Sequence, residues 1–363
     1  MVRSRSTPSD ARTADRVWTS SRGYLATIYL PLVLALSLPG HANALGGLMS
    51  RVYMEPCEQG QGVCMTTGEC RVRAGLDVGT CLLGTCCRIS KSCGDTAILN
   101  NTFFVDGASN SGSSCSLEVR KVPHRDGVCQ MRLDFIEFET VGPETLTGRC
   151  NVDSFQVSGQ NNLVPNICGS NSKQHIYLDV RGKTSSVQLR FRFGAANRGR
   201  RGWKISIRQI PCRSERLAPT GCLQYHEEPT GEIKSFNYGN PTEKTYPVEG
   251  MQYAVCFREN CELQLRKAGL FGLSAAAENQ AAAAANMDNN MDQQCFKPTD
   301  RDAVNQLSYL GFDNARFCKG NFFSDYLTVT PISRVDVMMY ERENNRQETW
   351  VGFYLTYTQR CRV

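Results

Sequence analysis

Four cysteines lie within thirteen residues of this chain, in the stretch CLLGTCCRISKSC from Cys81 to Cys93. Closely spaced thiols can bind zinc, perform redox chemistry or form disulfides. Structural zinc sites use C-x2-4-C pairs and often histidine, whereas the adjacent Cys86 and Cys87 would crowd one ion and no histidine lies close by in the sequence. The C-x-x-C spacing of redox motifs is absent as well. These spacings favour disulfides.

The N-terminus indicates the compartment in which these thiols exist. Five arginines among the first 23 residues precede an apolar run, YLATIYLPLVLALSL, and an A-x-A site at residues 42–44. This order is typical of a secretory signal peptide, and the apolar run is shorter than the roughly 20 residues that span a bilayer. A signal anchor is the alternative. Secretion predicts an oxidising environment in which the 18 cysteines, all of which follow the signal, form disulfides.

Charge and length limit the function classes. The formal charge of +6 falls to +3 when the leader, with five arginines and two aspartates, is removed. A balance so small and so evenly spread does not predict nucleic-acid binding. No later stretch is long and apolar enough to predict stable membrane insertion after signal removal. The length allows two ordinary domains and a small one.

The cysteines form three sets of six, and the second and third sets are similar enough to predict an internal repeat. The gap between the fifth and sixth cysteines is 43 residues in one set and 42 in the other. The first set spans 31 residues, too few to bury a stable core without cross-links. The sets are Cys57, Cys64, Cys70, Cys81, Cys86 and Cys87; Cys93, Cys115, Cys129, Cys150, Cys168 and Cys212; and Cys222, Cys256, Cys261, Cys295, Cys318 and Cys361.

Alternation of apolar and polar residues predicts β-strands. The runs SVQLRFRF, HIYLDV and VGFYLTY each repeat with a period of two, as expected for antiparallel sheets with one buried face. In RLDFIEFE the alternation changes parity between Phe135 and Ile136, which predicts a bulge or a strand covered on both faces. Residues 268–294 are rich in Ala, Asn and Gln and predict a surface insertion.

Taken together, these stretches resemble a known family. The order C93-G94, C115, C150-N-V-D153 and I167-C168-G169 resembles the CUB domain. GCLQYHEEPTGEIKSFNYGN and VGFYLTYTQRC, in the second repeat, resemble the form of this domain common in arthropod secreted proteins. The first six cysteines resemble the short cysteine-rich leader of such proteins and are similar to a clip domain. After the predicted signal peptide at 1–44, the resemblance implies a clip-like module at 45–90 and CUB domains at 91–214 and 220–363.

The resemblance implies an all-β fold, with one jelly-roll-like sandwich per CUB domain, and a set of disulfides. The six cysteines of the N-terminal module would pair among themselves, with 15 connectivities open. For the sandwiches, the family pattern, the repeat and the cysteines that then remain imply Cys93–Cys115, Cys150–Cys168, Cys222–Cys256, Cys295–Cys318, Cys129–Cys212 and Cys261–Cys361.

Calcium is the cofactor that the resemblance suggests. Many CUB domains bind it through clustered carboxylates, and Asp153 matches one such position, with Glu144 upstream. A later aspartate is missing from the first repeat, and Pro298 replaces the matching one in the second. Solvated or capping carboxylates are therefore favoured over calcium, and no cofactor is expected to be required.

No catalytic motif is present. The sequence lacks G-x-S-x-G, HExxH and a glycine-rich phosphate loop, so an enzyme is not expected. His175 is interpreted as a surface residue at the start of a strand and His226 as part of a solvated loop. Asn100 begins an N-x-T sequon, which predicts a glycan if the loop is exposed.

The basic stretch NRGRRGWK is a candidate ligand patch for a sulfated glycan or an acidic partner. The alternative is a polar loop whose tryptophan anchors the next strand. We therefore predict a secreted, non-catalytic protein that binds an extracellular protein or glycan. The alternatives are a regulator or adaptor of secreted serine proteases, acting through the clip-like module, and a glycosaminoglycan-binding, lectin-like protein. The patch residues are Arg198, Arg200, Arg201 and Trp203.

Overall fold

The structure is a computed structural model. The chain divides into two units, Met1–Glu55 and Pro56–Val363, and the residues that the structure describes all belong to the second. The predicted signal peptide lies outside the described residues, as do Arg198, Arg200, Cys295 and Cys318. The structure describes residues 56–57, 61–82, 84–107, 113–145, 147–182, 185–194, 201–239, 245–273, 308–312, 315–317, 327–329, 333–339 and 351–361.

The first cysteines form a small module of short strands and one helical turn. The helix begins after Thr66, whose Oγ1 accepts a hydrogen bond from the Glu69 amide at 3.2 Å. This contact satisfies an amide that would otherwise lack a partner at the start of the helix. The elements are β1 (Pro56–Cys57), β2 (Gly62–Met65), α3 (Thr67–Val72), β3 (Leu76–Cys81) and β4 (Gly84–Lys91).

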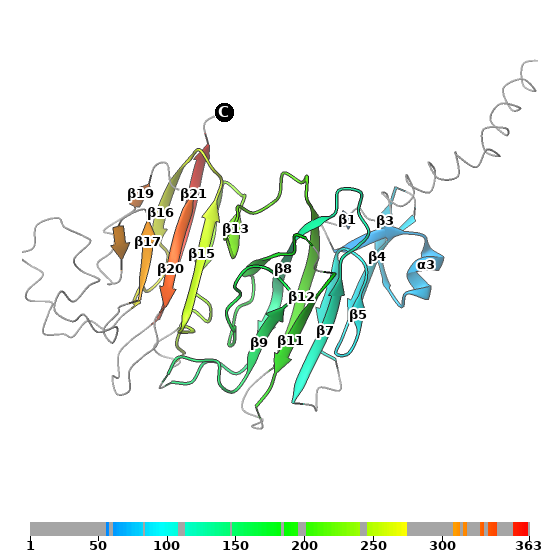
Figure 1. The fold of residues 1–363 in the computed structure, drawn as a ribbon, viewed down its shortest axis with the longest axis horizontal. Coiled ribbons are helices and arrows are strands. Elements are labelled where there is room, and N and C mark those ends of the chain that lie inside the picture. The colour runs from blue at the N-terminus through cyan, green and yellow to red at the C-terminus, as the bar shows by residue number, and fades with distance from the viewer. Residues whose placement is uncertain are drawn as a thin grey trace, which may run out of the picture. The chain divides into compact units, whose positions relative to one another are not determined.

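The first sandwich follows, and its strands lie in two sheets (Figure 1). The smaller sheet has the order β5-β7-β11-β9, and the larger contains β6, β12, β8 and β10 in that order. The strands are β5 (Thr96–Ala97), β6 (Thr102–Val105), β7 (Ser114–Arg120), β8 (Val128–Glu139), β9 (Ser154–Ser158), β10 (His175–Asp179), β11 (Ser186–Arg192) and β12 (Gly202–Pro211).

Aromatic side chains fill the space between these two sheets. Trp203 of the larger sheet stacks on Phe191 of the smaller at 4.1 Å between ring centroids, and Phe138 meets Phe155 edge to face at 5.7 Å. All four side chains are at most 1% exposed. Large buried rings of this kind contribute most of the area that holds two sheets together. The predicted all-β sandwich is confirmed.

The parity change in β8 is a β-bulge. Phe135 lies opposite Ile205 and Glu137 lies opposite Lys204, which leaves Ile136 as an extra residue without a partner. Its side chain is 47% exposed, whereas Phe135 is fully buried. Because of this extra residue, the aromatic side chains of Phe135 before the bulge and Phe138 after it both point into the core.

Strand β4 joins the cysteine-rich module to the first sandwich. Its first half pairs with β2 and β3, and its last residues pair in parallel with β6, with Ile89 opposite Thr102 and Lys91 opposite Phe104. Module and sandwich therefore share one eight-stranded sheet, in the order β1-β2-β4-β6-β12-β8-β10 with β3 on β4. The boundary predicted between residues 90 and 91 falls inside a strand.

The second sandwich has a five-stranded sheet, β13-β15-β20-β17-β18, and a four-stranded one, β14-β21-β16-β19. The predicted insertion begins later than residue 268, because Phe271 and Leu273 are buried and Gly272 bridges to Gly352; residues 274–294 lie outside the described part. The strands are β13 (Gln224–His226), β14 (Thr230–Lys234), β15 (Met251–Phe257), β16 (Cys261–Lys267), β17 (Tyr309–Phe312), β18 (Ala315–Phe317), β19 (Leu327–Val329), β20 (Arg334–Met339) and β21 (Tyr354–Cys361).

Candidate functional site

The cysteines of the module are all cross-linked within the module. Adjacent residues of a strand point to opposite faces, so Cys86 and Cys87 of β4 reach different partners rather than one common ion. Bridges at this density stabilise a piece of chain that is too small to hold a core. The pairs are Cys57–Cys86, Cys64–Cys81 and Cys70–Cys87.

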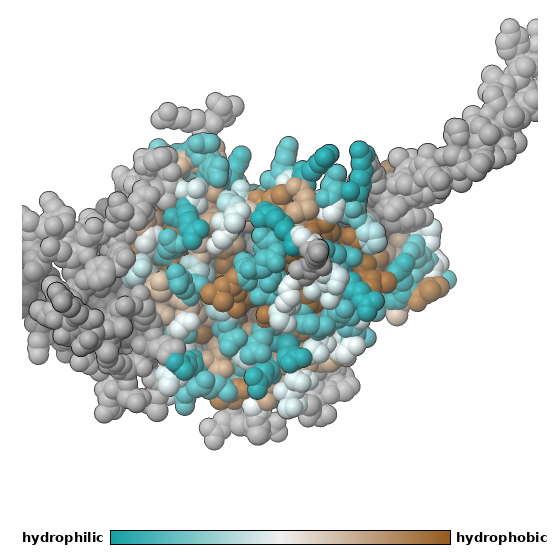
Figure 2. All heavy atoms as spheres, viewed as in Figure 1, coloured by the Kyte–Doolittle hydropathy of each residue, from teal (hydrophilic) through white to brown (hydrophobic). Residues whose placement is uncertain are grey.

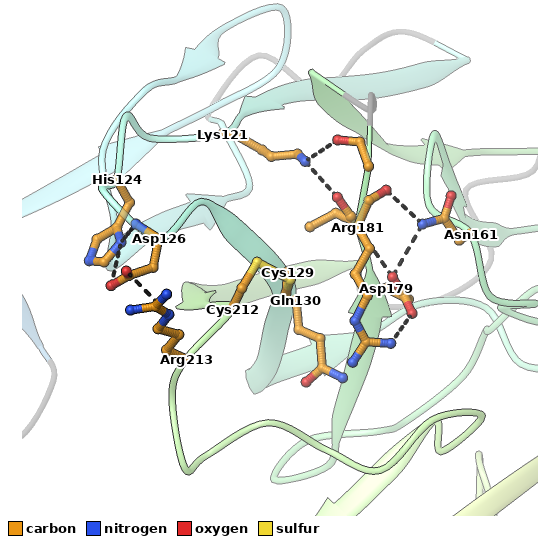
Figure 3. Close-up of a disulfide and its surroundings, with 12 residues drawn as sticks. Lys121, His124, Asp126, Cys129, Gln130, Asn161, Asp179, Arg181, Cys212 and Arg213 are labelled. Carbon is orange, nitrogen blue, oxygen red and sulfur yellow. Dashed lines mark hydrogen bonds and ion pairs between the residues drawn. A yellow bond between two sulfur atoms is a disulfide. The ribbon is translucent and has the colours of Figure 1, made fainter.

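The sandwiches contain their own bridges, and none of those described runs between modules. Figure 3 shows the bridge that ties the start of β8 to the end of β12, with the ion pair of Asp126 and Arg213 beside it at 3.8 Å. Its counterpart in the second sandwich joins two residues that lie opposite each other on β16 and β21. The described pairs are Cys93–Cys115, Cys150–Cys168, Cys129–Cys212, Cys222–Cys256 and Cys261–Cys361.

Asp153 is not part of a carboxylate cluster. Its side chain is fully buried, and both oxygens bind the guanidinium of Arg201 at 2.7 Å. Glu144 is exposed and accepts hydrogen bonds from Thr147 Oγ1 and Asn151 Nδ2 within its own loop. Among the described residues, no group of three or more histidine, cysteine, aspartate or glutamate side chains is arranged to hold a metal ion.

Two of the four residues of the predicted basic patch, Arg201 and Trp203, lie in the described part of the chain, and both are held by other residues of the fold. Trp203 is 1% exposed and packs in the sandwich core, which matches the alternative that it anchors the strand. The guanidinium of Arg201 is held by Asp153 and lies 5.0 Å from the ring of Phe193. Neither side chain is therefore available to a glycan in the way that the patch requires.

Asn100 of the sequon is used inside the fold. Its Oδ1 accepts a hydrogen bond from the Gln209 amide at 2.7 Å, and its Nδ2 donates to the Gln209 carbonyl at 3.2 Å. Thr102, the third residue of the sequon, is 1% exposed. The side chain of Asn100 thus extends the hydrogen bonding of β12 as a strand residue would.

A junction between the two sandwiches is the largest feature that the sequence did not reveal. The Tyr177 amide of β10 donates to the Leu223 carbonyl at 2.7 Å, just before β13. Gln130 and Ala218 exchange two hydrogen bonds of 2.8 Å each. An apolar cluster covers these contacts and contains Tyr177, Ile210, Ala218, Cys222, Ala254 and Cys256, with Leu217 and Tyr225 at its margin.

His175 and His226 belong to this junction, so their interpretation as solvated residues was wrong. Their ring centroids are 4.8 Å apart, and Nε2 of His175 lies 2.9 Å from the Tyr225 carbonyl. Burial holds the pKa of His175 well below its usual value, and the nearby Arg132 lowers it further. Burial, with Arg132 again, lowers the pKa of His226 to about 3. Both rings are therefore neutral at physiological pH.

A second set of contacts joins loops of the two sandwiches. Asn237 Oδ1 accepts a hydrogen bond from the Ser170 backbone amide at 2.9 Å, and the Asn237 backbone amide donates to Asn171 Oδ1 at 2.7 Å. Gly169 has a φ of 81°, and a Cβ there would lie only 2.1 Å from Asn237 Oδ1. Only glycine permits the close approach of Asn237 to this backbone position. Gly169 is also the glycine of the I167-C168-G169 stretch on which the CUB resemblance rests.

The family model described as "Animal CUB domain" matches residues 219–360. Residues 219–360 form a CUB domain. A search of the curated proteins finds no match for the chain. In the part of the chain that the structure describes, no helix has the length and apolar character needed to cross a membrane.

Three solved structures are similar to this chain at low sequence identity. The CUB1-EGF-CUB2 domains of rat MASP-1 match at 14% identity over 72% of this chain and 99% of that one, with a TM-score of 0.25. The same region of human MASP-1/3 matches at 13% identity over 71% and 98%, with a TM-score of 0.24. The full extracellular region of zebrafish Gpr126/Adgrg6 matches at 10% identity over 73% and 36%, with a TM-score of 0.27. Scores this low support no inference about arrangement or function.

Proposed function

We propose that this chain is a secreted, non-catalytic binding protein that works without a cofactor and recognises an extracellular protein or glycan. The CUB domain at residues 219–360 supports a recognition role. The single observation that carries the proposal is the buried junction, in which Tyr177 and Ala218 connect the CUB domain to the preceding sandwich. A junction of this kind presents loops of both sandwiches as one surface.

Rigidity is the physical advantage of such a surface. Ordering loops during binding costs free energy, and a surface ordered beforehand avoids part of that cost. Here the disulfides restrain each sandwich, the strand pairing of β4 with β6 restrains the module, and the junction restrains the two sandwiches. We therefore expect tight binding to a partner that contacts both sandwiches.

Proximity labelling with the full chain, secreted from a eukaryotic host, tests this function. We expect labelled partners to be extracellular, and we expect purified partners to bind the full chain. The variant Ala218→Asp, which places a charge in the buried junction, should weaken that binding, whereas Ser214→Asp, at a partly exposed position in the preceding linker, should not. Labelling restricted to intracellular proteins, or turnover of an activity-based probe by the purified chain, would refute the proposal.

An acidic glycan is a second candidate ligand, and one observation favours it. Arg190 and Arg192 project from the exposed face of β11, two residues apart. Cross-strand register puts Ser116 and Gln156 on either side of Arg190. Among the described residues neither arginine has an ion pair, and the nearest acid on this face, Glu118, is bound to Arg120. Two unpaired guanidinium groups beside neutral hydrogen-bonding side chains suit a sulfate or carboxylate.

Heparin chromatography distinguishes this candidate. The double variant Arg190→Gln/Arg192→Gln should elute at a lower salt concentration than the unmodified chain. The matched control is Arg266→Gln/Arg360→Gln, which removes the same charge from exposed positions on the second sandwich. Equal losses in both variants would indicate a dependence on net charge alone and would count against a site on β11.

The module supplies the observation behind the protease-adaptor alternative. Val72 and Leu82 are each 88% exposed, and Leu76 is 61% exposed. Figure 2 shows hydrophobic surface among hydrophilic residues on one face of the described part of the chain. Apolar side chains this exposed are common on surfaces that dock another protein. Capture of a secreted serine protease by the full chain, lost in Leu76→Ser/Leu82→Ser, would support it. Point variants are preferable to removal of residues 45–90, because that deletion also takes β4 away from β6.

A further inference from the structure

The carboxylate of Asp153 is completely enclosed by hydrogen-bond donors. Arg201 donates from Nε to Oδ2 and from Nη2 to Oδ1, both at 2.7 Å. The Val141 amide donates to Oδ2 at 3.0 Å and the Gly194 amide donates to Oδ1 at 3.1 Å. The Asp153 side chain has no exposed surface. The two carboxylate oxygens thus accept four hydrogen bonds. Two of these come from the positively charged guanidinium of Arg201.

These contacts do not fit a calcium ion. Calcium is held by six to eight oxygen atoms, whereas the groups around Asp153 are nitrogen donors. A cation placed against the same oxygens would meet the guanidinium of Arg201, and like charges at this separation repel. The other acidic candidate, Glu144, has its Oε2 bound to Thr147 and Asn151 and is exposed rather than directed at Asp153.

Arg201 instead performs the structural work that a bound cation would perform. It lies immediately before β12, and Asp153 immediately before β9. Through the two backbone amides, the same carboxylate also holds the segments that follow β8 and β11. Arg201 Nη2 donates further to the Gly194 carbonyl at 3.2 Å, and the guanidinium covers the ring of Phe193. One ion pair thus fixes the ends of four strands.

We propose that Arg201 is a built-in replacement for calcium at this end of the first sandwich, which makes the loops there independent of metal ions. The planar guanidinium supplies two parallel hydrogen bonds to a carboxylate, which a spherical ion cannot. The inference is independent of which ligand the chain binds. Its consequence is that stability, and any binding by these loops, should persist in the presence of a chelator.

Thermal unfolding of the full secreted chain tests this proposal. We expect the same Tm in excess calcium chloride, in excess magnesium chloride and in EDTA. A calcium-specific rise in Tm that disappears in Asp153→Asn would overturn the proposal. A rise that Asp153→Asn retains would place the calcium elsewhere and leave Asp153 with Arg201, as proposed. If Asp153→Asn is not secreted, the doubly neutral Asp153→Asn/Arg201→Gln takes its role, because it leaves no unpaired buried charge.

A double-mutant cycle tests the ion pair itself. Removing one partner of a largely buried pair is strongly destabilising, so Arg201→Gln should lower Tm by about 5–10 °C. Arg201→Lys keeps the charge but loses the paired hydrogen bonds, so its Tm should lie between those of the unmodified chain and Arg201→Gln. Adding Asp153→Asn to Arg201→Gln should recover part of the loss. The control is Arg190→Gln, which changes an exposed arginine on β11, the strand paired with β9, and should leave Tm unchanged. Additive losses in the cycle would contradict a coupled pair.

Discussion

Single polar side chains in this protein complete the backbone hydrogen bonding where strands end. Asn100 accepts from and donates to the backbone of Gln209, which is 2% exposed. The Gln209 side chain in turn accepts from the Val122 amide and donates to the Arg120 carbonyl, each at 2.9 Å. Such short networks matter because a buried backbone group without a partner is costly.

Replacement of Asn100 by alanine should therefore cost about 1–3 kcal/mol in the free energy of unfolding, because two buried groups of Gln209 lose their partners. Asn100→Asp keeps the acceptor and should cost less. Denaturant unfolding measures both, with Asn162→Ala, which removes one hydrogen bond to the Tyr177 carbonyl and one from the Asp179 amide, as a comparison.

Glycosylation of Asn100 stays a prediction, and intact mass before and after glycosidase treatment tests it. A glycan would use the same Nδ2 that donates to Gln209. If Asn100→Ala left stability unchanged, the hydrogen bonds to Gln209 would carry no net stabilisation.

Pairs of elements, rather than single strands, create the junction. Strand β10 is the last strand of its sheet, and the backbone just before β13 pairs with it through the Tyr177 amide. This arrangement covers an edge that would otherwise be free to pair with other chains. It also encloses two imidazoles, since His175 is on β10 and His226 is on β13.

The junction should weaken in acid. His175 and His226 have pKa values in the folded chain that lie below the unfolded value of roughly 6.5. The unfolded chain then binds more protons than the folded one below that pH, so stability falls as the pH decreases from about 6.5 toward the folded values. The slope approaches about 1.4 kcal/mol per pH unit for each histidine. Arg132, which faces both rings, adds to the cost of protonation.

Denaturant unfolding between pH 7.5 and pH 5 measures this slope. His226→Phe, whose ring can keep the contacts with Phe257 and Tyr357, and His175→Gln should each flatten the dependence. His124→Gln is the control, because its ring lies in a partly exposed turn beside Asp126. An unchanged slope in both junction variants would show that other groups carry the acid sensitivity.

Local patterns in the sequence predicted the elements well and their long-range contacts poorly. Alternation in SVQLRFRF predicted β11, and the parity change at Ile136 predicted the bulge, because burial on one face is written into neighbouring residues. The ion pair between Asp153 and Arg201 joins residues 48 positions apart, and the histidines at the junction are 51 positions apart in the sequence. Local periodicity does not indicate contacts between residues so far apart in the sequence. Arg201, His175 and His226 were therefore interpreted as surface residues.

At the scale of the whole molecule, the module and the two sandwiches are continuous from β1 to β21. The eight-stranded sheet runs from the module into the first sandwich, and the cluster around Ala218 runs from the first sandwich into the second. Domains linked by flexible tethers unfold separately, whereas parts that share a sheet and a buried cluster unfold together to the extent that these contacts are strong.

We therefore expect one main thermal transition for residues 56–363 with the disulfides intact. Ala218→Asp, which buries a charge where Gln130 and Tyr177 now pack, should split that transition or add an earlier one. Hydrogen exchange at β10 and β13 should then accelerate, while exchange in β11 and β16, away from the junction, should not. Ser214→Asp, at a partly exposed position in the linker, should leave a single transition. Two well-separated transitions in the unmodified chain would mean that the junction contributes too little to couple the sandwiches, and the preordered surface proposed here would then lose its physical basis.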